Sequence, residues 1–577
     1  MRKFLLTVAT CALVSLCSSN AFATANFVYH EQTANFVATP TCPSGGTDTS
    51  AGRYVENTDR SGAAGFQIFS PETYTLHFKI EFQFFTNQLR VYYTTDGSNP
   101  SGSFGTPLGT TQVAVASYNS TYSDQTQGCQ IVDVAVGAIP PQPAGTTVKY
   151  IIGAWHSGGG PEVFSNSGTC TGCFSCTDST TGCATTFQYN VVAPPATPLI
   201  ISEFRVRGPN GANDEFVEIY NNSDSDVTVN AFDGSAGFAL AASNGVTRFT
   251  IPNGTVIPAR GHYLGVNSVG YSLAAYPAGN GTTATGDATY TTDIPDNAGI
   301  ALFSTANPAN FTLANRLDAV GSTSEANTLY KEGTGYPALT PFSIDYSFYR
   351  DLCGKGGSIT TFGTCPQNGL PKDTNNNAAD FVFVDTNGTS AGAGQRLGAP
   401  GPENLSSPIQ RNALLPGASL DATVAASSPP NRVRDTTSDP ANNSTFGTLD
   451  IRRRYTNNTG ANVTRLRFRV IDITTFPAPS GIADMRPRTS TDVVVGGIND
   501  PATCPGGTTP CTVTVRGTTL EEPPSQPNGG GFNSSLSAGT ITLATPLAPG
   551  ASINLRFLLG LQQTGSFKFY INIEALP

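Results

Sequence analysis

Two apolar runs separated by a turn-forming segment occupy residues 199–223. Their apolar positions are Ile200, Ile201, Phe204 and Val206, followed by Phe216, Val217, Ile219 and Tyr220. Between the runs, residues 208–211 read Gly-Pro-Asn-Gly, a combination that interrupts regular structure and favours tight turns. Short apolar runs bounded in this way are typical of β-strands. The segment therefore predicts a β-hairpin that opens a domain.

Short strand-like runs recur along the rest of the chain. In its N-terminal part they cover residues 74–80, 89–93, 112–115, 130–136, 147–155 and 186–192. The 61 Gly and 41 Pro residues supply turns between such runs. No long stretch after the N-terminus keeps the 3.6-residue periodicity of an amphipathic helix. The fold class that we expect is therefore all-β.

The length of 577 residues is enough for three or four domains. A stiff proline-rich stretch over residues 191–198 marks one boundary, and a Ser/Pro segment after residue 404 marks another. We expect three immunoglobulin-like β-sandwich domains in tandem after a signal peptide. Their expected limits are residues 24–197, 198–404 and 405–577.

The N-terminus has the pattern of a secretory signal peptide. Arg2 and Lys3 precede an apolar run over residues 4–16, and Ala21-Phe22-Ala23 is a small-x-small cleavage pattern. Cleavage after Ala23 or after Ala25 fits equally well. No later segment is apolar enough to span a bilayer. The sequence therefore predicts a signal peptide over residues 1–23 and a secreted protein that is extracellular, on the cell surface or in the periplasm.

Ten cysteines remain after this signal peptide, in even numbers within each expected domain. They are Cys42, Cys129, Cys170, Cys173, Cys176 and Cys183, then Cys353 and Cys365, then Cys504 and Cys511. Even numbers in an oxidising compartment indicate disulfides within domains. The two-residue spacers of the 170–183 run would also suit a zinc ion, and the pairing among the six cannot be ranked. Cys504 and Cys511 are expected to staple a hairpin turn between residues 492–495 and 512–515.

The segment 199–404 resembles a lamin-tail domain, an immunoglobulin-like sandwich of nuclear lamins and of many secreted bacterial proteins. The resemblance begins with the hairpin motifs ISEF and EFVEIYNNS. It continues in order with GFAL, FTIPNGTVIPARGHYL, NAGIALF, RLDAVG, YSFYR, ADF and GAPGPEN. Such a domain implies a fold rather than a chemistry.

A shorter resemblance concerns the first expected domain. The stretch VYYTTDGSNPSG is similar to a hairpin of the accessory sandwiches attached to secreted glycosidases, and VKYIIGAW is similar to a fibronectin type III strand. If Tyr118, Tyr122 and Trp155 formed one exposed plane, they would favour carbohydrate binding. Buried aromatic side chains would favour a structural role instead.

The opening hairpin also contains Glu203, Glu215 and Glu218. Paired carboxylates can act as general acid and base, but these three can equally support the fold, with Arg350 as a partner for one of them. The four histidines share no motif, and no nucleophile elbow, zinc-protease helix or phosphate-binding loop is found. We therefore expect no catalytic residues and no cofactor.

Two further patterns carry weaker expectations about ligands. Asp373, Asn375, Asn377 and Asp380 alternate as calcium ligands do, but the turn glycine and the closing glutamate of a calcium loop are missing. Calcium therefore remains an alternative to the expectation of no metal.

The second pattern is an arginine stripe in the last expected domain. Alternation places Arg465, Arg467 and Arg469 on one face of a half-exposed strand, opposite Leu466, Phe468 and Val470. The stripe could meet an anionic surface polymer, or form a solvated face paired with nearby acids. Nucleic-acid binding is not expected, because the net charge is −10 and no nucleic-acid motif occurs.

Taken together, these patterns favour a secreted, non-catalytic protein with a structural or binding role, whose partner is an unknown cell-surface protein or polysaccharide. The alternative is a carbohydrate- or cell-wall-binding accessory protein, and a third hypothesis is an undetected secreted hydrolase.

Overall fold

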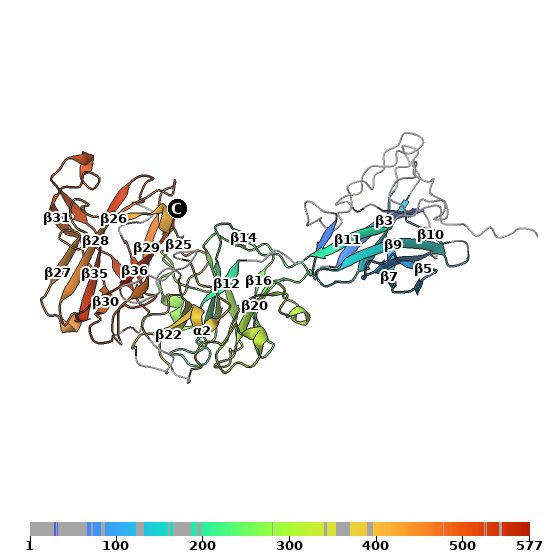
Figure 1. The fold of residues 1–577 in the computed structure, drawn as a ribbon, viewed down its shortest axis with the longest axis horizontal. Helices are drawn as coiled ribbons and strands as arrows, with labels where there is room; N and C mark the ends of the chain where they lie inside the picture. The colour runs from blue at the N-terminus through green and yellow to red at the C-terminus, as the bar shows by residue number, and fades with distance from the viewer. Residues whose placement is uncertain are drawn as a thin grey trace, which may run out of the picture. The chain divides into compact units, whose positions relative to one another are not determined.

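The computed structural model divides the chain into two compact units (Figure 1). The first lies within residues 1–195 together with 232–234, and the second comprises 196–231 and 235–577. The described residues are 28–30, 32, 66–70, 73–81, 87–122, 132–159, 162–165, 186–192, 198–279, 281–339, 343–352, 370–388, 396–476, 478–523, 526, 528–539, 541 and 545–577. Within these residues the fold is all-β, as expected, and no helix is long and apolar enough to cross a membrane.

The first unit contains a nine-stranded sheet that encloses a single hydrophobic core. Its strands are β1 (Val28–Tyr29), β2 (Gln67–Phe69), β3 (Tyr74–Glu81), β4 (Asn87–Thr94), β7 (Gln112–Tyr122), β8 (Val132–Ile139), β9 (Thr147–His156), β10 (Val163–Phe164) and β11 (Phe187–Val192). The order is β1-β3-β8-β7-β4-β9-β11-β2, with β10 paired to β9. All six strands expected in this part of the chain are confirmed.

Strand β7 connects the two halves of this sheet. Its first part pairs with β4 and its second part with β8, and the register shifts between Tyr118 and Ser120. A shift of this kind bends a strand, so β7 can pair with β4 in one half of the sheet and with β8 in the other. A small hairpin of β5 (Ser101–Ser103) and β6 (Thr106–Leu108) extends between β4 and β7.

The second unit begins with the expected hairpin, formed by antiparallel β12 (Leu199–Arg205) and β13 (Phe216–Asn221). These strands are central in a seven-stranded sheet of order β19-β18-β13-β12-β22-β23-β24. The other members are β18 (His262–Asn267), β19 (Ala288–Tyr290), β22 (Tyr346–Arg350), β23 (Phe381–Asp385) and β24 (Arg396–Leu397). The prediction of a hairpin at this position is therefore confirmed.

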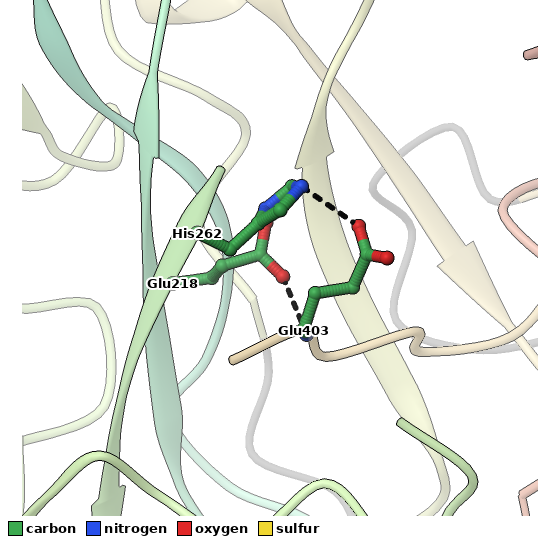
Figure 2. A group of neighbouring side chains, drawn as sticks. All are labelled: Glu218, His262 and Glu403. Atoms are coloured by element: carbon green, nitrogen blue, oxygen red, sulfur yellow. Dashed lines mark hydrogen bonds and ion pairs between the residues drawn. The ribbon is translucent and has the colours of Figure 1, made fainter. Parts of the chain in front are cut away.

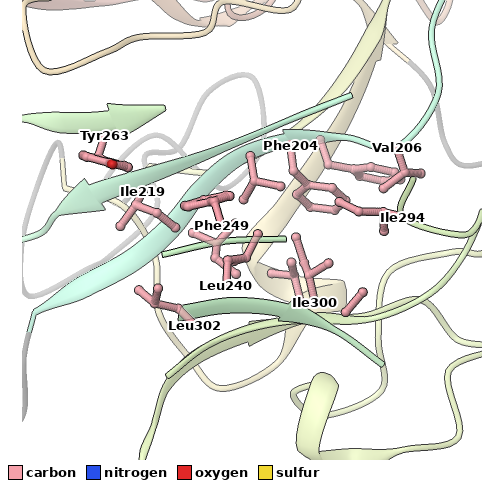
Figure 3. Close-up of a cluster of buried hydrophobic side chains, with 14 of the residues drawn as sticks. Phe204, Val206, Ile219, Leu240, Phe249, Tyr263, Ile294, Ile300 and Leu302 are labelled. Atoms are coloured by element: carbon pink, nitrogen blue, oxygen red, sulfur yellow. The ribbon is translucent and has the colours of Figure 1, made fainter. Parts of the chain in front are cut away.

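A four-stranded sheet packs against one face of the seven-stranded sheet. Its order is β16 (Thr247–Pro252), β15 (Gly237–Ala242), β20 (Ile300–Phe303) and β21 (Arg316–Val320). Figure 3 shows the core between the sheets, where Phe204 and Ile219 meet Leu240 and Ile300. Strands β14 (Val227–Thr228) and β17 (Val256–Ile257) form a separate small ladder.

Two further five-stranded sheets make up the C-terminal part of this unit. One has the order β25 (Ile409–Gln410), β36 (Phe569–Leu576), β29 (Arg465–Ile473), β34 (Ser535–Ser537) and β33 (Thr519–Glu521). The other has the order β26 (Gly417–Ser419), β28 (Thr448–Thr456), β35 (Ser552–Gln563) and β30 (Asp484–Arg488), with β27 (Arg432–Asp435) paired to β28. Both sheets bury their facing apolar side chains in a second core.

The seven-stranded sheet is buried on both faces, which links the two cores into one unit. All six residues of β13 are buried. In β22, Phe348 joins the first core and Tyr349 joins the second. In β23, Phe383 and Val384 divide in the same way. Because neighbouring strand residues point to opposite faces, residues 198–404 contribute to the core of residues 405–577.

A hairpin of β31 (Val493–Ile498) and β32 (Cys511–Val515) carries the one disulfide found among the described residues. Cys504 and Cys511 close its turn, as the sequence predicts. The hairpin packs on a small core of its own that includes Leu420.

Candidate functional site

Three ionisable side chains meet on the face of the seven-stranded sheet that the C-terminal part covers. Glu218 lies in β13, and His262 begins β18. Tyr220 pairs with His262 across these strands, so Glu218 is the diagonal neighbour of the histidine on the same face. Glu403 comes from the segment that follows β24.

The histidine lies between the two carboxylates (Figure 2). Nδ1 of His262 is 3.0 Å from Oε1 of Glu218, and Nε2 is 3.0 Å from Oε2 of Glu403. The backbone N–H of Glu403 donates to Oε2 of Glu218 at 2.7 Å. All three side chains are buried. A neutral imidazole donates from only one nitrogen, so bonding on both sides requires a second ring proton or a protonated carboxyl group.

Two arginines of β29 close the cluster from the opposite side. Arg467 forms ion pairs with Glu403 and, at 2.9 Å, with Glu574. Nη2 of Arg469 is 2.7 Å from Oε2 of Glu403, and its Nε is 3.1 Å from Oε1 of Glu574. A Cβ at Gly401 would lie 2.6 Å from Nη1 of Arg469, so glycine permits this close approach.

The expectation that the arginine stripe is half-exposed is therefore wrong for two of its three arginines. Arg467 is 1% exposed and Arg469 is 8% exposed. The alternation itself is confirmed, because Leu466, Phe468 and Val470 lie in the second core. The face that the sequence assigned to solvent is covered by the seven-stranded sheet and its glutamates. The third member, Arg465, is half-buried. It has no carboxylate partner among the described residues.

We call the buried ionisable residues at this position the junction network. It contains more carboxyl groups than basic side chains. Its carboxyl groups are Glu203, Glu218, Glu403, Glu521 and Glu574, and its bases are Arg467, Arg469 and His262. Burial raises the pKa of Glu203 to about 7, and the Glu218 carboxylate adds to the shift. Burial also raises the pKa of Glu521. Against the effect of burial, Arg467 and Arg469 lower the pKa of Glu574.

One ligand atom from each of Glu218, His262 and Glu403 could face a common metal ion, since these atoms lie within 4.8 Å of one another. Arginines, however, already engage both oxygens of Glu403. Oε1 of Glu218 accepts from the Ser202 hydroxyl, and its Oε2 accepts a backbone N–H. The donor set therefore fits an ion-pair network better than a metal centre.

The space beside the network is also small. The cavity that the network lines has a volume of about 60 Å³, which is enough for a few waters. Sites for small organic ligands measure roughly 300–1,000 Å³. The arrangement can hold two parts of the chain together, and the cavity beside it is smaller than a typical organic-ligand site.

The other carboxylate considered in the hairpin, Glu215, lies apart from the network. It accepts from Nδ2 of Asn267 at 2.9 Å and from the backbone N–H of Ile294 at 2.6 Å. Burial raises its pKa to about 8. Glu215 therefore holds neighbouring loops in place.

The expected partnership of Arg350 with one of these glutamates is wrong. Glu203 pairs with Tyr349 across β12 and β22, so the alternation of β22 turns Arg350 to the opposite face. There its Nη2 lies 2.5 Å from Oδ2 of Asp318, and its Nε donates to the carbonyl of Ile201.

Two of the four calcium candidates form structural hydrogen bonds, Asp380 within its own loop and Asn377 with residues of the 319–332 segment. Asp380 accepts backbone N–H groups of Thr374 and Asn376, and Oδ1 of Asn377 accepts those of Gly321 and Glu332. Asn375 has a positive φ of 55°, a turn conformation that asparagine tolerates.

The fourth candidate, Asp373, belongs to a different acidic group. One oxygen of Asp373 lies within 4.8 Å of oxygens of Asp318 and Glu332. Arg350 and Arg316 are nearby counter-charges, at 3.6 Å from Asp373 and 3.2 Å from Glu332. The sequence pattern thus identified a loop rich in structural hydrogen bonds and missed the acids that lie beside it.

The condition that would favour carbohydrate binding, an exposed plane that includes Trp155, is not met. Trp155 is buried, with the Arg90 guanidinium 5.5 Å from its ring and Phe104 in edge contact at 5.6 Å. Tyr118 is 58% exposed, and the side chain of Tyr122 lies outside the described residues. The burial of Trp155 indicates a structural role for that residue.

Several expectations fall outside the described residues. These are the signal peptide over residues 1–23 and the pairing of Cys42, Cys129, Cys170, Cys173, Cys176, Cys183, Cys353 and Cys365.

Comparison with known proteins does not assign the chain to a family. No family model matches the chain, and no curated protein matches it. Among solved structures, a crystal structure of the uncharacterized protein lmo2446 from Listeria monocytogenes EGD-e is similar with a TM-score of 0.16 and 9% identity. The similarity covers 88% of this chain and 30% of that protein, and at this TM-score it supports no inference.

Proposed function

We propose that this chain is a secreted, non-catalytic structural or binding protein that acts at the cell surface or outside the cell, and that residues 198–404 form a lamin-tail domain. The observation that carries the proposal is the closure of the Glu218–His262–Glu403 cluster by Arg467 and Arg469. A catalytic group must be reachable by its substrate, whereas this cluster is buried beside a cavity of about 60 Å³.

The Cys504–Cys511 disulfide supports the proposed export, because disulfides persist in oxidising compartments. The partner would be a surface protein or a polysaccharide. In this proposal the second unit acts as a rigid body, since its two cores share the seven-stranded sheet.

The test uses the chain from residue 24 onward, fluorescently labelled and mixed with isolated cell envelope. The expected result is saturable retention, together with no turnover of chromogenic ester, phosphodiester or glycoside substrates. Turnover that disappears in a His262→Asn variant would overturn the non-catalytic assignment. Absence of retention on envelope from every growth condition would overturn the surface-binding role.

A carbohydrate-binding role is the second candidate, and the exposure of Tyr118 is the observation that favours it. Retention on purified polysaccharide that is lost in a Tyr118→Ala variant would support this role. Retention on envelope protein that is unchanged by Tyr118→Ala would support the first proposal instead.

A further inference from the structure

An arginine lies on the core-facing side of strand β28. Leu449, Ile451 and Tyr455 of this strand belong to the second hydrophobic core. Arg453 occupies the position between Ile451 and Tyr455 in the same alternating series, so its side chain leaves the sheet on the same face. Arginine is rarely placed on such a face without a carboxylate partner.

Neither Arg453 nor its neighbour Arg432 forms an ion pair within the part of the chain that the structure describes. Nη1 of Arg453 donates to the carbonyls of Arg452 at 2.8 Å and Asn431 at 3.3 Å. Nε of Arg432 donates to the carbonyl of Ser427 at 3.3 Å, and its guanidinium lies over the Phe567 ring. Burial lowers the pKa of Arg453, and the like charge of Arg432 adds to this effect.

The two arginines line an open cavity between the C-terminal sheets. Its volume is about 370 Å³, and its walls include Phe557 of one sheet and Phe569 and Ile571 of the other. A second cavity of about 500 Å³ shares Arg432 and Phe567 with the first. Both volumes are in the range of small-molecule sites.

The pairing of β36 explains why this side of the sandwich is open. Strand β25 pairs only with Glu574 and Ala575 of β36. Phe569 and Ile571 lie beyond that contact and are only half-buried. The apolar walls of the cavity are therefore accessible at the same place where the two guanidiniums lack a counter-charge.

We propose that this cavity binds an aliphatic carboxylate, with the hydrocarbon on the half-buried side chains of Phe567, Phe569 and Ile571 and the carboxylate on Arg432 and Arg453. A carboxylate would accept charge-assisted hydrogen bonds from the guanidiniums and offset their mutual repulsion. The hydrocarbon would cover apolar surface that water now contacts. The site shares no residue with the junction network, so it stands independently of the function proposed above.

The test is isothermal titration of the full chain with dodecanoate below its micellar concentration. Saturable binding of one molecule per chain is expected. Dodecanol supplies the same hydrocarbon without the charge, and inorganic phosphate supplies an anion without the hydrocarbon; both are expected to bind at least tenfold more weakly. Equal binding of dodecanol, equal binding of phosphate, or no binding of dodecanoate would each overturn the proposal.

Substitutions test whether Arg453 binds the carboxylate of dodecanoate. Arg453→Met keeps the length of the side chain and removes its charge, and it is expected to weaken dodecanoate binding at least tenfold. Arg454→Met is the matched control, because Arg454 is the next residue and leaves the opposite face of β28; its binding should equal that of the wild type. Cooperative thermal unfolding checks that each variant is folded, and Arg432→Gln serves as a second variant. Full binding by folded Arg453→Met and Arg432→Gln would overturn the assignment.

Discussion

Arg469 and Glu403 form a buried ion pair in which Nη2 lies 2.7 Å from Oε2. The arginine belongs to β29, and the glutamate lies in the segment after β24. Their pairing adds a charged contact between residues 198–404 and the C-terminal sheets to the apolar contacts that Tyr349 and Val384 make in the second core. Such a pair adds little net stability over an apolar replacement, but the loss of one partner leaves a buried charge uncompensated.

Arg469→Met should therefore destabilise the second unit strongly. Glu403 and Glu574 would each lose a bond to this guanidinium, and we expect a loss of about 3–5 kcal/mol in the free energy of unfolding. Urea titration of the variant and of the wild type measures this loss. Arg465→Met is the matched control from the same strand and should change the free energy by less than about 0.5 kcal/mol. Equal effects of the two substitutions would show that the network is energetically unimportant.

The core between the seven- and four-stranded sheets depends on a glycine. A Cβ at Gly265 would lie 2.1 Å from Cε1 of Phe249, whose ring is buried. Gly265→Ala should therefore force the ring aside and cost about 1–3 kcal/mol, measured by urea unfolding. At Gly539 a Cβ would meet nothing within 4 Å, so Gly539→Ala should be nearly neutral. A neutral Gly265→Ala would contradict the packing described here.

The strands and the hairpin staple were predictable because their signals are local. The apolar runs of β12 and β13 lie on either side of one turn, and Cys504 and Cys511 flank another. Alternation also placed Leu466, Phe468 and Val470 on the face opposite the arginines, and these three residues lie in the second core. Each of these inferences needs only a few consecutive residues.

The junction network was not predictable in the same way. Alternation states that Arg467 and Arg469 share a face, but not whether another sheet covers that face. Glu203, Glu218, His262, Glu403 and Glu574 come from five separate segments, and only tertiary pairing brings them together. Arg453 is intermediate: its place in the apolar series of β28 is visible in the sequence, whereas its lack of a carboxylate partner is a property of the fold.

Glu332 gives the second unit a pH dependence with a defined sign. Burial raises the pKa of Glu332 to about 8, and Asp318 adds to the shift. The unfolded chain releases this proton near pH 4.5, whereas the folded chain keeps it to about pH 8, so the folded state binds more protons in this window. The contribution to stability is therefore fully present below about pH 4.5 and is lost as the pH rises through about 8.

Glu332→Gln should remove this dependence. Oε1 of Glu332 accepts from Arg316 at 3.2 Å, and its Oε2 has no hydrogen-bond partner among the described residues, so an amide can replace the protonated carboxyl group. The variant should match the wild type at about pH 4 and exceed it at about pH 8.5 by on the order of 2 kcal/mol. Urea unfolding at both pH values measures this difference. A difference that does not change with pH would contradict the prediction.

The Cys504–Cys511 disulfide should stabilise its hairpin rather than the whole unit. The two cysteines are seven residues apart, and closing so short a loop contributes at most about 2.5 kcal/mol. The hairpin has its own small core with Leu420 and Val495. A double Cys504→Ala, Cys511→Ala variant should therefore lose hydrogen-exchange protection in β31 and β32, while β28 and β35 keep theirs. Loss of protection in all four strands would show instead that the hairpin and the C-terminal sandwich unfold as one cooperative unit.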